Sequence, residues 1–168
     1  MPQYKILIVD DIPLVLKALQ RVFRPEGYHI LTATCAEEAM KVMEGENIDM
    51  IITDENMPGL SGTDLLSLVR HKFPSVVRIM ITGTDDIEVA KNAINSGEIY
   101  RFFMKPWDDF ELLISVKYAL EHKIAKQEND RLRSLVNKQK KLLNNLEKEH
   151  PGIADKRLTE SGAIVIDP

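Results

Sequence analysis

The sequence contains a single cysteine, Cys35, in 168 residues, which excludes an internal disulfide framework and a metal cluster built on cysteine ligands. Aromatic residues make up only 6% of the chain, too few to predict a stacking platform for nucleic-acid bases. No apolar run approaches membrane-spanning length, and the N-terminus lacks a charged-then-apolar signal segment. We therefore expect a cytoplasmic protein without a membrane partner.

Length and composition indicate one globular domain with an appendage. A chain of 168 residues is long enough to bury one core but short for two. Hydrophobic residues make up 44% of it and charged residues 29%, which is typical of a folded globular protein. The net charge of -4 argues against nucleic acid as the main partner.

Five short apolar runs alternate with helical patterns in the first three quarters of the chain. The runs are residues 6–9, 29–32, 50–53, 77–81 and 100–104. The first, third and fourth are nearly unbroken, as in parallel strands covered on both faces, whereas the second and fifth alternate and fit edge positions. Strand, helix, strand repeats imply right-handed crossovers, so we predict an α/β domain with a doubly wound parallel sheet over residues 1–122.

After Trp107 a helical pattern continues to Pro151, which predicts a helix of about 40 residues. Its first part should pack on the sheet through Phe110, Leu113, Val116 and Leu120. Residues 123–150 should form an extended helix, either a linker or a coiled-coil dimerisation segment. The apolar positions that fit a heptad seam are Leu132, Leu135, Leu142 and Leu146, widened by Val136 and Leu143. A solvated helix held by surface ion pairs is the alternative.

Residues 151–168 are expected to be a tail or the start of a missing output domain. Two short stretches with β character flank a turn at Glu160-Ser161-Gly162, which fits a β-hairpin. Because a lone hairpin is marginally stable, it would need a packing partner.

The isoleucine-rich run at residues 50–53 ends at Asp54, and a Pro58-Gly59 turn follows. An aspartate there could instead be a helix cap. The next helix signal, however, begins only at Ser61, which occupies the cap position itself, with Asp64 at the capping-box position. We therefore interpret Asp54 as a functional carboxylate at the edge of the sheet.

Chemistry-bearing residues follow four of the five predicted strands. They are Asp10 and Asp11, then Asp54, then Thr82-Gly83-Thr84, then Lys105. Taken singly, these residues could be a helix cap, a strand-end hydroxyl and a surface charge. The carboxyl ends of parallel strands share one edge, however, so together they predict a site there. Clustered carboxylates without histidine or cysteine favour magnesium, and a lysine beside them favours phosphate.

In order and placement these residues resemble the receiver domain of bacterial two-component response regulators, over residues 4–122. The phrases that carry the resemblance are Ile8-Val9-Asp10-Asp11, Met57-Pro58-Gly59-Leu60-Ser61-Gly62 and Lys105-Pro106-Trp107. The resemblance implies a five-stranded flavodoxin-like fold. It also implies a phosphorylation-dependent regulator whose partners are a sensor histidine kinase or phosphotransfer protein and an unknown output domain or effector.

The resemblance implies that Asp54 is the phosphoacceptor. Asp11 and Asp54, with the backbone carbonyl of Asn56, would hold Mg²⁺, and Asp10 would orient a metal-bound water. Lys105 would pair with the carboxylate and then with a phosphoryl oxygen.

The remaining implied roles concern phosphate contacts and switching. Thr82 and the N–H of Gly83 would bind phosphoryl oxygens, and Thr84, with Asn56, would tune dephosphorylation. Phe102, three residues before the lysine, would be the aromatic switch residue. Many family members have tyrosine there, and an ordinary core phenylalanine is the alternative.

Two other functions compete with this interpretation. Haloacid-dehalogenase-type phosphatases also use an aspartate nucleophile with Mg²⁺, but their nucleophile follows the first strand, whereas here the acid pair comes first. A DNA-binding regulator would be favoured by the ten lysines and arginines, against six acids, in residues 121–157. No DNA-binding motif accompanies them, so direct nucleic-acid binding is not expected. We expect no enzyme activity beyond self-directed phosphotransfer and autodephosphorylation.

Overall fold

The computed structural model describes residues 4–151, and its five strands form one parallel sheet. The strands are β1 (Lys5–Val9), β2 (His29–Ala33), β3 (Met50–Asp54), β4 (Val77–Thr82) and β5 (Arg101–Met104). Their order is β2-β1-β3-β4-β5, and every neighbouring pair is parallel. The predicted doubly wound sheet is thus confirmed, with the two alternating runs at its edges as expected.

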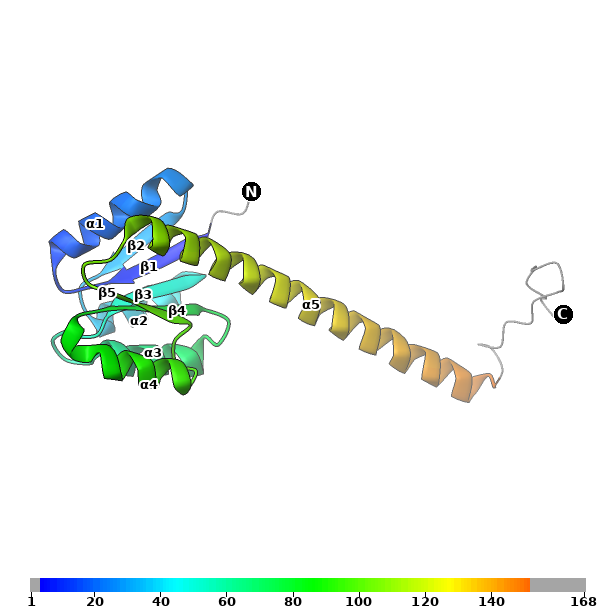
Figure 1. The fold of residues 1–168 in the computed structure, drawn as a ribbon. Helices are drawn as coiled ribbons and strands as arrows, with labels where there is room; N and C mark the ends of the chain where they lie inside the picture. The colour runs from blue at the N-terminus through cyan, green and yellow to red at the C-terminus, as the bar shows by residue number, and fades with distance from the viewer. Residues whose placement is uncertain (1–3, 152–168) are drawn as a thin grey trace. The chain divides into compact units, whose positions relative to one another are not determined.

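Helices cover both faces of this sheet (Figure 1). They are α1 (Pro13–Phe23), α2 (Ala36–Gly45), α3 (Gly62–Lys72), α4 (Ile87–Asn95) and α5 (Asp109–Glu149), with 3-10 turns η1 (Arg24–Glu26) and η2 (Thr84–Asp86). α1 and the first part of α5 lie on one face, and α2, α3 and α4 lie on the other.

Two buried clusters, one on each face, explain the unbroken apolar runs. Ile6 and Ile8 of β1 belong to the cluster under α1 and α5, whereas Leu7 and Val9 belong to the cluster under α2, α3 and α4. Successive side chains of a strand point to opposite faces, so both sets must be apolar. The sheet is therefore a fixed platform whose strand ends hold their positions.

The single helix predicted after Trp107 is present, and α5 runs for 41 residues. One expected contact is wrong: Phe110 is 70% exposed, and Leu112 is fully buried instead. Two residues correspond to about 200° around a helix, so the face that contains Leu112 and Val116 cannot also contain Phe110. Val116 and Leu120 are buried as predicted, and Leu113 is partly buried against the same cluster.

The residues up to Lys123 form one compact unit, and those from Ile124 onward belong to another. At the end of the first unit, Lys123 Nζ lies 2.7 Å from Asp49 Oδ1, and the backbone N–H of Lys5 donates to Asp49 Oδ2. In the second unit α5 continues as a helix with exposed apolar side chains at Leu132, Leu135, Val136, Leu142 and Leu143.

Two expectations concern other parts of the chain. Within residues 4–151, no helix is both long enough and apolar enough to cross a bilayer. The hairpin proposed for the last residues lies outside the described range, so it stays a prediction.

Candidate functional site

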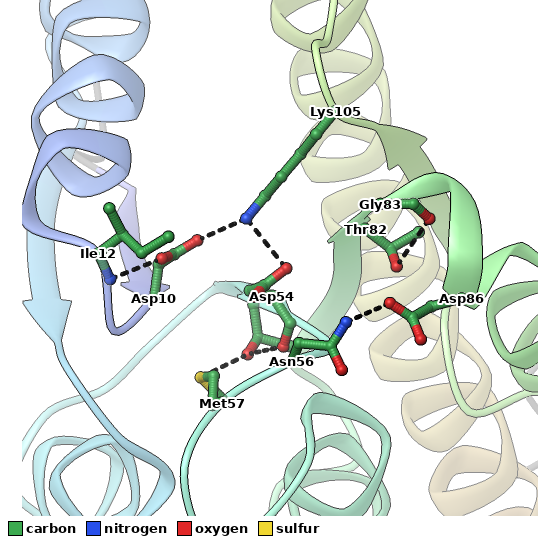
Figure 2. A network of polar contacts seen from close by, with 10 residues as sticks. Asp10, Ile12, Asp54, Asn56, Met57, Thr82, Gly83, Asp86 and Lys105 are labelled. Carbon is green, nitrogen blue, oxygen red and sulfur yellow. Dashed lines mark hydrogen bonds and ion pairs between the residues drawn. The ribbon is translucent and has the colours of Figure 1, made fainter.

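Four strands bring the predicted site residues to one edge of the sheet (Figure 2). Asp10 follows β1 directly, Asp54 ends β3, Thr82 ends β4, and Lys105 follows β5. The register aligns these ends, because Asp54 lies opposite Ile81, next to Thr82, and Thr82 lies opposite Met104, next to Lys105. Chain order and parallel pairing are therefore sufficient to gather residues as far as 95 positions apart.

Lys105 joins two of the buried carboxylates, Asp54 and Asp10. Its Nζ lies 3.0 Å from Asp54 Oδ1 and 3.1 Å from Asp10 Oδ2. Burial by itself lowers the pKa of Lys105, but its hydrogen bonds to Asp54 and Asp10 outweigh that effect, so its pKa is raised. The ammonium is therefore held in its charged form between the two acids.

Asp54, which the sequence placed at the edge of the sheet, is buried, with 6% of its surface exposed. Burial is the main cause that raises its pKa. The hydrogen bond and the positive charge of Lys105 lower this pKa. The negative charge of Asp10 raises it, but by less than burial does. Desolvation thus contributes more to the raised pKa of Asp54 than repulsion by Asp10 does, because the end of β3 lies between β1 and β4.

Asp10, Asp11 and Asp54 can each present a carboxylate oxygen such that the three lie within 4.8 Å of one another. Asp10 also accepts the backbone N–H of Ile12 through Oδ1, at 2.8 Å. Three carboxylates whose oxygens can approach one another in this way form an all-oxygen donor set, which suits a hard divalent cation such as Mg²⁺. The residues present therefore fit the metal expected from the sequence.

The residues expected to bind phosphate include Thr82, at the end of β4, and Gly83, in the loop that follows. Thr82 is fully buried, and its Oγ1 is 3.5 Å from the carbonyl oxygen of Gly83. A Cβ placed on Gly83 would meet no atom within 4 Å, so the space beside this backbone is open. Thr84 is exposed at the start of η2. Lys105 N–H donates to the Thr82 carbonyl at 2.8 Å, which ties this loop to the end of β5.

Phe102 lies on β5 opposite Met80 and is partly buried. It packs against the cluster that contains Ala90 and Ala93 of α4. Its neighbour Phe103 faces the opposite cluster and is buried. Phe102 is therefore neither fully enclosed nor fully exposed, and its switching role stays a prediction.

Glu55 is a buried residue at the site that the sequence analysis did not single out. It is 8% exposed, and its Oε2 accepts the N–H of Thr63 at 2.8 Å and the Thr63 hydroxyl at 2.7 Å. Burial raises its pKa, and the two bonds from Thr63 partly offset that effect. Glu55 thereby attaches the end of β3 to the first turn of α3. The bond spans eight residues, so no local capping pattern could reveal it.

Comparisons with known proteins agree with this geometry. The family model described as response regulator receiver domain matches residues 6–117. The chain is 35% identical over 119 residues to the hydrogenase transcriptional regulatory protein HoxA of Cupriavidus necator, which covers 71% of this chain and 24% of that protein. It is 30% identical over 134 residues to a cyclic di-GMP phosphodiesterase of Thermotoga maritima, covering 79% of this chain and 36% of that one.

A solved structure is similar over nearly its whole length. The signal receiver domain of an HD domain-containing protein from Pseudomonas fluorescens Pf-5 has a TM-score of 0.72 and 36% identity, covering 76% of this chain and 94% of that one. By contrast, the chain spans between 24% and 36% of the length of the two curated relatives named above.

Proposed function

Because this chain belongs to the response regulator receiver domain family, we propose that Asp54 accepts a phosphoryl group from a histidine of a partner kinase or phosphotransfer protein. Receiver domains are signalling domains, so the protein's task is to change state when Asp54 is modified. The observation that best supports this proposal is Lys105, which bonds to Asp54 and Asp10 beside the third carboxylate, Asp11.

The proposed transfer forms a bond from an Asp54 oxygen to phosphorus and breaks the bond from phosphorus to the partner's histidine nitrogen. Phosphoryl transfer passes through a loose transition state, so the protein contributes position and charge more than covalent chemistry. Lys105 would release an Asp54 oxygen and neutralise a phosphoryl oxygen, as its 3.0 Å contact with that carboxylate permits. Thr82 and the N–H of Gly83 would bind the other phosphoryl oxygens.

Mg²⁺, held by Asp11, Asp54 and the Asn56 carbonyl with Asp10 nearby, would neutralise further charge on the phosphoryl group. Without a cation, three carboxylates that can bring oxygens within 4.8 Å of one another would repel an incoming phosphate. We propose the cytoplasmic location that was expected from the sequence, in agreement with the family to which the chain belongs.

Switching would run from Thr82 through Phe102. If the Thr82 hydroxyl turns from the Gly83 carbonyl to the phosphoryl group, the loop after β4 moves with it. Phe102 lies against α4, which begins just beyond that loop, so its packing would change. Asn56 and Thr84, which flank the site, would set how fast the phosphoryl group is lost.

The output of the receiver would come from the domain that α5 joins to it or from the effector that α5 contacts. The relatives named above include a transcriptional regulator and a cyclic di-GMP phosphodiesterase, so related receivers are joined to different activities. We propose that α5 transmits the state of the receiver to an output domain or effector. Residues 123–150 would act as linker or dimerisation helix and residues 151–168 as a tail or the start of that domain.

Labelling tests the phosphoacceptor. The full chain is treated with radiolabelled acetyl phosphate and Mg²⁺, and we expect about one acid-stable, base-labile label per chain at saturation. Asp54→Asn should take none, whereas Asp64→Asn, an exposed acid on α3, should label normally. Labelling that persists in Asp54→Asn would show that another residue is modified, and an unlabelled wild type would reject the function.

Sedimentation tests whether two copies of the chain pair through the heptad leucines of α5. We propose that two copies pair through Leu132, Leu135, Leu142 and Leu146, since the first three are exposed and lie at heptad spacing. Leu135→Lys with Leu142→Lys should abolish self-association. Asn137→Lys with Asn144→Lys adds the same charge on the opposite side of the helix and should leave it intact. A monomer at high concentration in both phosphorylation states would rule out pairing.

A further inference from the structure

A side-chain hydrogen bond joins the two loops that carry the site. Asn56, two residues after Asp54, donates through Nδ2 to Oδ2 of Asp86, at the end of η2 in the loop after β4 (Figure 2). The first loop follows Asp54, the proposed phosphoacceptor at the end of β3, and the second follows Thr82 at the end of β4. The side chain of Asp86 thus ties the loop after β3 to the loop after β4 directly.

Asp86 occupies the N-cap position of α4, where an aspartate normally accepts N–H groups of the first helical turn. Here its side chain makes no capping bond within the described helix and contacts Asn56 instead. Its own backbone N–H donates to the Gly83 carbonyl at 3.3 Å and closes the turn. The residue is therefore anchored through its backbone while its carboxylate faces the site.

This contact determines which way the Asn56 carboxamide faces. An ionised carboxylate only accepts hydrogen bonds, so Asn56 must present its NH₂ group to Asp86. The carboxamide oxygen, Oδ1, is then the atom left to accept a hydrogen bond, and it would accept one from a water molecule that approaches the phosphoryl group on Asp54. With Asp86 removed, the carboxamide of this exposed residue could turn freely, and either end could face the site.

We propose that Asp86 is a positioning residue for the loss of the phosphoryl group from Asp54, acting by orienting the carboxamide of Asn56. The inference rests on the proposed function. In the reaction, the water oxygen bonds to phosphorus while the bond from phosphorus to the Asp54 oxygen breaks. The electron pair of that bond returns to the Asp54 carboxylate, a water proton goes to solvent, and inorganic phosphate leaves. Asn56 Oδ1 only orients the water, and Asp86 holds Asn56.

The test measures the decay of labelled full-length protein. The chain is phosphorylated with labelled acetyl phosphate and Mg²⁺, the donor is removed, and retained label is followed in time. Asp86→Ala should slow the loss about 3- to 10-fold, as expected when one orienting contact is removed. Asn56→Ala should slow it similarly, and the double variant should be no slower than Asn56→Ala.

Two variants separate orientation from charge. Asp86→Asn removes the charge but keeps an oxygen that can accept from Asn56, so it should restore most of the wild-type rate. Asp85→Ala removes an acid from the same turn, at an exposed neighbouring position, and should leave the rate unchanged. Circular dichroism checks folding, and Asp86→Leu, of similar size, replaces Asp86→Ala if that variant is unfolded.

The outcomes are distinguishable. An unlabelled wild type overturns the proposed function and this inference with it. A labelled wild type whose decay is the same in Asp86→Ala overturns the inference alone. Equal slowing in Asp86→Asn and Asp86→Ala would assign the effect to charge, and additive slowing in the double variant would show that Asp86 acts without Asn56. Either result also overturns the inference.

Discussion

Asp54 is a buried carboxylate that the fold tolerates because Lys105 lies 3.0 Å from one of its oxygens. The partnership is shared, since the same ammonium also bonds to Asp10. A buried charge costs free energy unless it is paired, and here one cation serves two acids. The site can therefore accommodate further positive charge, in agreement with the proposed binding of Mg²⁺.

Asp54→Asn should stabilise the folded protein at pH 7. The folded-state pKa of Asp54 is raised, mainly by burial, so the folded state holds this proton more tightly than the unfolded state. The contribution of this group to stability is therefore lost as pH rises from the ordinary aspartate pKa through the raised value. At pH 7 the ionised, buried Asp54 costs free energy that asparagine does not, so we expect Asp54→Asn to unfold at a higher urea concentration than the wild type.

Urea unfolding between pH 3 and pH 7 measures this gain, which should shrink as the pH falls. Asp130→Asn, an exposed site on α5, should change the free energy of unfolding by less than about 0.5 kcal/mol at any pH. An Asp54→Asn variant that is less stable than wild type at pH 7 would mean that the ion pair with Lys105 outweighs the cost of burial.

Gly62 should tolerate no side chain. A Cβ there would lie 2.1 Å from the Asp54 carbonyl oxygen and 2.9 Å from Glu55 Cα, both backbone atoms. Gly62→Ala must therefore push α3 away from the end of β3, at a cost of about 1–3 kcal/mol or more, and displace Asp54. Unfolding in urea and labelling with acetyl phosphate should both report the damage.

Gly45→Ala provides the matched control, because a Cβ there meets nothing within 4 Å and the residue ends α2. Alanine favours helix, so stability should be unchanged or rise by up to about 1 kcal/mol. If Gly62→Ala behaved like Gly45→Ala, the close approach at the end of β3 would be disproved.

At the scale of elements, the junction of β3 with α3 holds the site together. Glu55 accepts from Thr63, the Ser61 hydroxyl accepts the N–H of Asp64, and Gly62 N–H donates to the Glu55 carbonyl. These bonds satisfy N–H groups of the first turn of α3, which would otherwise lack partners. The loop after Asp54 is thereby fixed at its far end, which leaves the segment with Asn56 between two anchors.

For α5, the corrected packing gives opposite expectations for two neighbouring residues. Leu112→Ala removes a fully buried side chain and should cost about 2–5 kcal/mol in the free energy of unfolding. Phe110→Ala removes a larger side chain that is 70% exposed and should cost less than about 0.5 kcal/mol. Urea denaturation of the two variants at the same concentration makes the comparison. A larger loss of unfolding free energy for Phe110→Ala than for Leu112→Ala would show that Phe110 lies on the packed face, as first expected from the sequence.

At the scale of the whole molecule, the chain has two units with different tasks. The unit that ends at Lys123 contains the sheet, both buried clusters and all the site residues. The helix beyond it contributes exposed leucines and basic side chains but none of the site. We therefore propose that modification belongs to the first unit and transmission to the part of α5 that follows it.

A chain of residues 1–126 should fold, label at Asp54 and unfold at the same urea concentration as the full chain diluted until it is monomeric. A chain of residues 1–122 lacks Lys123, whose ammonium bonds to the carboxylate and carbonyl of Asp49. It should be less stable, by about 1–3 kcal/mol, because Asp49 loses a charged partner. Equal stability of the two shortened chains would show that this contact contributes nothing.

The sequence by itself determined the elements of the receiver, the edge positions of β2 and β5, and which residues meet at the site. This was possible because strand and helix patterns are local and parallel pairing sends every strand's carboxyl end to one edge. Their positions at the ends of strands were enough to identify four of the candidate site residues, Asp10, Asp54, Thr82 and Lys105.

Tertiary structure alone decided which of these groups are buried and what each one contacts. The burial of Asp54, the choice of Leu112 over Phe110, the Glu55–Thr63 bond and the Asn56–Asp86 bond were not predictable from local patterns. Each depends on side chains brought together across a turn or a sheet, in the last case over 30 residues. A periodic pattern indicates which residues share a face, but only packing in space determines which face is buried and which atoms lie opposite it.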